Sequence, residues 1–136
     1  MDLPWDFVVP GVPVSIQTKN KRRKAQYRAQ VAAAARAAWP DPAIPPLTGE
    51  LQIHITYYHD NAPLDTDNSM KLIQDALVGI VYEDDDQLVD RHGHRRDKNK
   101  PYRLVGFTRV LADGFLCGGP FVHVRIEEQG DEVALP

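Results

Sequence analysis

Residues Pro63–Gln87, PLDTDNSMKLIQDALVGIVYEDDDQ, place carboxylates at both ends of an apolar helical segment, and the rest of the chain is organised around them. Asp65 and Asp67 stand two residues apart before the segment, and the acidic triplet Asp84–Asp86 follows it. Side chains two residues apart on an extended chain point to the same side. Mg²⁺ takes octahedral oxygen ligands, usually one or two protein carboxylates with waters and a substrate phosphate. The stretch therefore has the donors of a divalent cation site.

The apolar pattern between the carboxylates predicts a helix that starts near Asp67 or Asn68 and continues through Val78 until Gly79. Lys71 lies one turn beyond Asp67, where it can pair with Asp67 or Asp75 or reach a scissile phosphate. The core stripe of this helix is expected to consist of Met70, Ile73, Leu77 and Ile80.

A structural interpretation of the same residues is also open, in which DTDN caps a helix and EDDD is a solvated turn. A D-x-D pair alone is a weak motif. However, close carboxylates repel each other by on the order of 1 kcal/mol per pair even in water. A bound cation would remove that repulsion, so the two clusters together favour a metal site.

Periodicity predicts the remaining elements. Lys19–Trp39 is rich in alanine, uninterrupted by Gly or Pro until Pro40, and should form the longest helix, with Tyr27, Val31, Ala34, Ala35 and Ala38 on its buried stripe. Leu51–Tyr58 alternates strictly, which predicts a half-buried strand with Tyr58 and His54 on the polar face. Further strands are expected at Phe7–Val9, Gln87–Arg95, Tyr102–Leu111 and Phe121–Glu127, with His123 exposed. Prolines restrict the first of these to a sheet edge or a strand end. A rigid linker is expected at 40–46, a loop at 112–119 and a frayed tail at 129–136.

The charge distribution points to a polyanionic partner, although the formal net charge is −3. Two basic clusters flank an acidic centre, an arrangement that suits a metal-dependent enzyme acting on nucleic acid. The alternative is uneven charge on solvated faces. The two clusters hold 14 of the 16 Lys and Arg residues: Lys19, Lys21, Arg22, Arg23, Lys24, Arg28 and Arg36, then Arg91, Arg95, Arg96, Lys98, Lys100, Arg103 and Arg109.

Other classes of protein fit the sequence less well. The length of 136 residues suits one domain spanning residues 1–136. A lone cysteine, Cys117, precludes an internal disulfide framework and fits a reducing compartment. No apolar run approaches the ~20 residues of a membrane span, and no signal peptide is recognisable, so we expect a cytoplasmic protein without membrane contact. His92 and His94 have no Cys or third His nearby, which argues against zinc.

The segments PLDTDNSMKLIQDAL and YEDDDQLVD resemble the RusA-type Holliday junction resolvases, a family common in prophages. The signature of that family is D-x-D-N, a lysine on the following helix, D-A-L, and D-D-x-Q followed by an apolar pair. The segments GVPVSIQTKNKRRKAQYRAQV and FVHVRIEE are similar to its opening and closing parts, so that the resemblance spans about Phe7 to Glu128.

The resemblance implies an α/β (α+β-like) fold, with a mixed β-sheet packed against two main helices. It implies metal ligation by Asp65, Asp67 and Asp85 and a functional role for Lys71; Asp84 and Asp86 remain register alternatives, with Gln87 favouring Asp85. The cofactor would be Mg²⁺, with Mn²⁺ as an alternative ion. The protein would be a homodimer that nicks two symmetric strands of a four-way DNA junction. DNA contacts are expected from Lys19, Lys21, Arg22, Arg23, Lys24, Arg28, Arg91, Arg95 and Arg96.

Two other functions remain open. One is a metal-dependent nuclease that prefers flaps or ordinary duplex, which would use the same acidic centre. The other is a non-catalytic DNA-binding phage protein, in which the aspartates would be structural.

Overall fold

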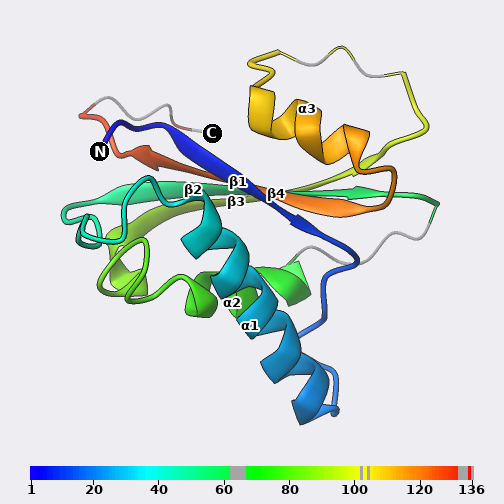
Figure 1. Ribbon diagram of the computed structural model, residues 1–136, viewed down its shortest axis with the longest axis horizontal. Coiled ribbons are helices and arrows are strands. Elements are labelled where there is room, and N and C mark those ends of the chain that lie inside the picture. The colour runs from blue at the N-terminus through cyan, green and yellow to red at the C-terminus, as the bar shows by residue number, and fades with distance from the viewer. Residues whose placement is uncertain (62–66, 102, 104, 132–134, 136) are drawn as a thin grey trace.

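The computed structural model describes residues 1–61, 67–101, 103, 105–131 and 135, with the side chains of residues 67 and 68 excepted. Within these residues, four strands form one mixed sheet in the order β1-β4-β2-β3, with helices on both of its faces (Figure 1). The elements are β1 (Trp5–Pro10), α1 (Lys21–Ala38), β2 (Leu51–His59), α2 (Asp67–Ala76), the 3₁₀ helix η1 (Asp85–Gln87), β3 (Leu88–Asp97), α3 (Arg109–Leu116) and β4 (Phe121–Glu128).

The strand pairing confirms the α+β class. β4 runs antiparallel to both β1 and β2, whereas β3 runs parallel to β2. Parallel neighbours need a crossover connection, and α2 lies in that connection between β2 and β3. β1 lies at one edge of the sheet, one of the two places predicted from its prolines, since proline cannot donate a ladder hydrogen bond.

Helices α1 and α2 cover one face of the sheet and enclose the main core (Figure 1). Alternation places Phe7, Ile55 and Val124 on this face, where all three are buried. α1 contributes Tyr27, Val31 and Ala35 to the core, while the predicted Ala38 is exposed. The reason is that α1 ends at Ala38, and the buried Trp39 continues the apolar stripe, packing edge-on against Trp5 with ring centroids 5.0 Å apart.

α2 ends at Ala76, two residues before the predicted Val78. The chain turns there, and Gly79 adopts a φ of +83° that favours glycine. Met70, Ile73 and Leu77 are buried as predicted, whereas Ile80 is only half-buried.

The prediction of a strand at Tyr102–Leu111 and a loop at 112–119 is wrong, because Arg109–Leu116 is helix α3. Thr108 caps this helix by accepting a hydrogen bond from the backbone N–H of Leu111 at 3.1 Å. Gly114 lets the helix approach the sheet, since a Cβ there would lie 2.7 Å from the ring of Phe121. Tyr102 and Leu104 lie outside the described residues.

α3 packs on the face of the sheet opposite α1 and α2, over β1 and β4 (Figure 1). It buries Tyr58 against Phe115 and Phe121, which corrects the expectation that Tyr58 lies on a polar face. His123 is likewise buried rather than exposed, and lies 2.8 Å from Asp6. Among the described residues, no helix is long and apolar enough to cross a bilayer.

Candidate active site

The acidic triplet forms a tight turn at the start of η1. Asp84 is its N-cap, and the Asp84 carboxylate accepts a hydrogen bond from the backbone N–H of Asp86 at 3.0 Å. This capping contact occupies the Asp84 side chain within the turn.

The side-chain amide of Gln87 links the turn to the rest of the protein through hydrogen bonds of both its oxygen and its nitrogen. Its Oε1 accepts hydrogen bonds from the backbone N–H groups of Glu83 at 2.8 Å and Asp84 at 3.1 Å. Its Nε2 donates to the backbone carbonyls of Leu47 at 2.9 Å and Gly49 at 3.0 Å. This bracing had not been expected from the sequence, although Gln at the third position after a capping Asp is a capping-box signal.

Lys71 joins α2 to the acidic turn. Its Nζ lies 3.2 Å from Oδ2 of Asp85 and 3.1 Å from Oδ1 of Asp75. The pairing with Asp75, four residues along α2, confirms one of the partners expected for this lysine. Asp85 comes from the turn before β3, so a contact between residues 14 apart in sequence unites the two halves of the motif.

These contacts keep both partners charged. The hydrogen bond from Lys71, with a further contribution from Asp84, lowers the pKa of the Asp85 carboxyl below its ordinary value. The hydrogen bond to Asp75, followed by that to Asp85, raises the pKa of the Lys71 ammonium. Asp85 is therefore an ionised carboxylate that is paired with the Lys71 ammonium.

The structure brings together some of the predicted site residues. Asp67 is the first residue of α2, and its backbone lies one helical turn before Lys71. Asp65 and the side chain of Asp67 lie outside the described residues, so the expectation that the two carboxylates share one side stays a prediction.

The acidic turn fits a hard divalent cation. Asp84, Asp85 and Asp86 each offer a carboxylate oxygen, and these atoms lie within 4.8 Å of one another. Oxygen donors are the ligands that Mg²⁺ prefers. Asp84 is engaged in the cap and Asp86 is exposed, whereas Asp85 is half-buried and faces Lys71. Of the triplet, Asp85 is thus the residue directed at α2.

A family model for endodeoxyribonuclease RusA matches residues 13–105, a range that includes α1, β2, α2, η1 and β3. The chain belongs to the RusA family. It is therefore an endodeoxyribonuclease, a hydrolase acting on Holliday junctions. A comparison with curated protein sequences finds no match. The matched range contains Lys71 and Asp85 and ends before α3.

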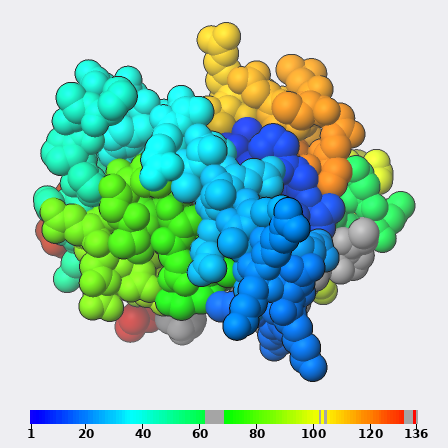
Figure 2. All heavy atoms as spheres, turned by 60° about the horizontal axis from the view of Figure 1, so that its bottom comes forward, coloured from blue at the N-terminus to red at the C-terminus, as the bar shows by residue number. Residues whose placement is uncertain are grey.

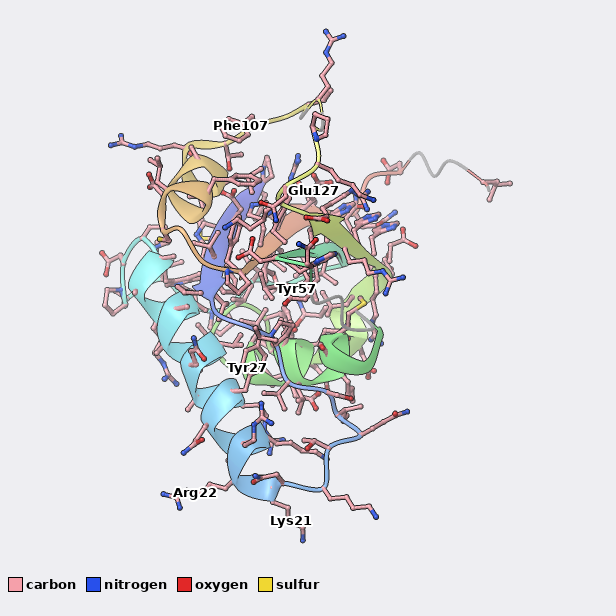
Figure 3. The ribbon with its side chains drawn as sticks, turned by 90° about the vertical axis from the view of Figure 1, so that its right-hand side faces the viewer. Lys21, Arg22, Tyr27, Tyr57, Phe107 and Glu127 are labelled. Atoms are coloured by element: carbon pink, nitrogen blue, oxygen red, sulfur yellow. The ribbon has the colours of Figure 1, made fainter. Side chains whose placement is uncertain are left out.

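In this RusA family member, all of the first basic cluster except Arg36 lies at the N-terminal end of α1, which projects from the body of the protein (Figure 2). Asn20 caps the helix, because its Oδ1 accepts a hydrogen bond from the backbone N–H of Arg23 at 3.1 Å. Lys21 and Arg22 extend away from the core at this end (Figure 3). The exposed residues of the cluster in this region are Lys19, Lys21, Arg22, Arg23 and Arg28, and Lys24 is partly exposed.

The second basic cluster is divided between the two faces of the sheet. The register pairs Arg91 with Ile53 and Arg95 with Tyr57, on the face that α1 and α2 cover, but pairs Arg96 with Tyr58 on the opposite face. All three arginines are exposed. Arg91 also donates hydrogen bonds to the backbone carbonyls of Asp85 at 3.0 Å and Leu88 at 3.2 Å. It therefore supports the acidic turn directly, a role that the sequence pattern had not indicated.

Proposed function

We propose that the protein is a Mg²⁺-dependent endonuclease that resolves four-way DNA junctions by paired symmetric nicks, as a homodimer acting in recombination and repair. The contact between Lys71 and Asp85 carries this proposal. It joins the lysine of α2 to the acidic turn within the range that matches the RusA family. The site thereby has an anionic group that can bind a cation next to a cationic group that can bind a phosphate.

Asp85 would hold the cation together with Asp65 and Asp67. When bound, Mg²⁺ would polarise a phosphate oxygen and lower the pKa of a coordinated water. Lys71 would donate hydrogen bonds to the scissile phosphate and offset its negative charge. Gln87 and Arg91 would keep the Asp85 backbone in place, since both form hydrogen bonds with the acidic turn.

The basic residues at the start of α1 and on β3 would bind the phosphates of the junction arms. Each active site would cut one strand, so paired nicks need two sites related by a two-fold axis. A homodimer supplies them. Sedimentation of the protein alone and with a junction tests this point, and a strictly monomeric protein in both samples would contradict it.

Cleavage of a synthetic four-way junction, a flap and a linear duplex, each with and without Mg²⁺, tests the activity. The expected result is metal-dependent cleavage of the junction at symmetric positions. Equal cleavage of all three substrates would indicate a nuclease of different preference. Binding without cleavage under any metal, Mn²⁺ included, would indicate a DNA-binding protein.

Single substitutions in the triplet and at Asp67 test the assignment of the metal ligands. Asp85→Asn and Asp67→Asn should abolish cleavage and leave junction binding intact. Asp84→Asn should affect cleavage only through the shape of the turn, because the Asp84 side chain caps η1. Asp86→Asn should retain cleavage, because Asp86 is exposed. Loss of cleavage in Asp86→Asn together with activity retained in Asp85→Asn would identify Asp86, not Asp85, as the metal ligand of the triplet.

A further inference from the structure

We propose that Asp75 is a positioning residue of the active site, which retains the Lys71 ammonium when a divalent cation takes the Asp85 carboxylate. The inference rests on the proposed cation site at Asp85. Asp75 is not one of the expected metal ligands. Its role would be to free the Asp85 carboxylate for the divalent cation and to keep the displaced Lys71 ammonium near the site.

The starting arrangement is a lysine shared by two carboxylates. Lys71 Nζ lies 3.1 Å from Asp75 and 3.2 Å from Asp85, so neither partner is preferred by distance. An ammonium group has three donors, enough for both contacts at once. Among carboxylates whose positions the structure describes, these two are the only ones within 4.0 Å of this nitrogen.

A divalent cation at Asp85 would compete directly with Lys71. Both would need lone pairs of the same carboxylate, and two cations within about 4 Å repel each other even in water. The Lys71 ammonium lies 3.2 Å from the Asp85 carboxylate to which the proposed cation would bind. This repulsion would move the Lys71 ammonium out of its contact with Oδ2 of Asp85 when the cation binds.

Asp75 is suited to hold the released lysine because the two residues share a helix. The i,i+4 spacing keeps their side chains adjacent whatever happens at η1. Asp75 lies near the C-terminal end of α2, on the side of Lys71 away from Asp67. The ammonium that Asp75 retains would therefore remain on α2, one helical turn after the first residue of the helix, where a phosphate can reach it.

Two substitutions should consequently change cation affinity in opposite directions. In Asp75→Asn, Lys71 keeps Asp85 as its ionised partner, which makes displacement harder and weakens Mg²⁺ binding. In Lys71→Met, the competitor is absent, so Mg²⁺ binding becomes tighter even though cleavage falls. A purely structural role for Asp75 predicts neither pattern, because an exposed i,i+4 ion pair contributes little to folding.

A double-mutant cycle on the full-length protein tests the proposal, with Mg²⁺ affinity measured by calorimetry and by the metal-induced rise in Tm. We expect Asp75→Asn to weaken Mg²⁺ binding at least about threefold when Lys71 is present. In the Lys71→Met background, its effect should shrink to that of Glu83→Gln, a change of an exposed acid two residues before Asp85. Asp75→Glu should restore affinity, since Glu can also pair with Lys71.

The same measurements separate the two proposals. If the wild-type protein shows no response to Mg²⁺ or Mn²⁺, or if Asp85→Asn leaves the response unchanged, the proposed metal site at Asp85 is wrong. If Asp85→Asn abolishes the response but Asp75→Asn weakens binding equally in both Lys71 backgrounds, Asp75 acts through its own charge and the positioning role is wrong. An unchanged affinity in Asp75→Asn would overturn the positioning role as well.

Discussion

The side-chain oxygen of Gln87 lies 3.1 Å from the backbone nitrogen of Asp84 and accepts its hydrogen bond, which closes the acidic turn into a capping box. The amide nitrogen of the same side chain donates to the backbone carbonyl of Leu47, 40 residues earlier. One glutamine thus sets both the shape of the turn and its position on the protein.

Gln87→Leu should reduce cleavage at limiting Mg²⁺ by about tenfold or more, because Asp85 would lose its fixed position opposite Lys71. It should also lower the free energy of unfolding by about 1–3 kcal/mol, since the hydrogen bonds at both ends of the side chain are lost. Cleavage rates against Mg²⁺ concentration and denaturant unfolding measure the two effects. Gln52→Leu, the same exchange on β2, should leave the cleavage rate unchanged, and equal losses in both variants would contradict the bracing role.

Replacing Lys21, Arg22 and Arg23 together with alanine should weaken junction binding and flatten its dependence on salt. Each lost phosphate contact should reduce the slope of log affinity against log salt by about 0.9. Junction binding measured over a series of salt concentrations gives this slope. Arg36→Ala, a change in the last turn of the same helix, is the control and should have little effect. An unchanged slope in the triple variant would show that α1 does not contact DNA.

Gly114→Ala should destabilise the protein by about 1–3 kcal/mol, even though alanine favours helix. The new methyl group would meet the ring of Phe121 at 2.7 Å. That ring cannot move away easily, because it is buried between Tyr58 and Phe115. The matched control is Gly119→Ala, where a Cβ meets nothing within 4 Å. Thermal unfolding of both variants tests this, and a Gly114→Ala protein as stable as the wild type would contradict the close packing of α3.

His54→Gln should make folding stability less sensitive to mild acid. Burial lowers the pKa of His54 below its ordinary 6.5, and His92, Arg125 and His94 lower it further against the opposing effect of Glu127. Below pH 6.5 the unfolded chain therefore binds more protons at this position than the folded protein does, so stability falls as pH drops through the folded pKa.

The midpoint of thermal unfolding, measured between pH 7.5 and 5, tests this expectation. The wild-type protein should lose more stability over this range than His54→Gln. The variant should still lose some stability, because burial, followed by Arg96 and His92, also lowers the pKa of His94. Identical losses in the two proteins would show that His54 does not contribute.

The sequence was most informative where structure follows from local periodicity. The alternation of Leu51–Tyr58 and the alanine run before Trp39 were enough to predict β2 and α1, because burial of one face imposes a period on each element. α3 was missed for the corresponding reason: it is a helix of 8 residues with a glycine inside it, too short for its period to stand out. The glycine, Gly114, is explained by the close approach of the Phe121 ring, a contact that no local sequence pattern reveals.

For the candidate site, the residue types, the D-x-D-N and D-D-x-Q motifs and the resemblance to the RusA family could be recognised before the fold was known. The folded protein was needed to show which aspartate of the triplet faces Lys71, that Asp75 shares the lysine, and that Gln87 and Arg91 hold the turn. This is because motif spacing fixes only distances along the chain. The meeting of Lys71 and Asp85 depends instead on how α2 packs on the sheet and where η1 begins.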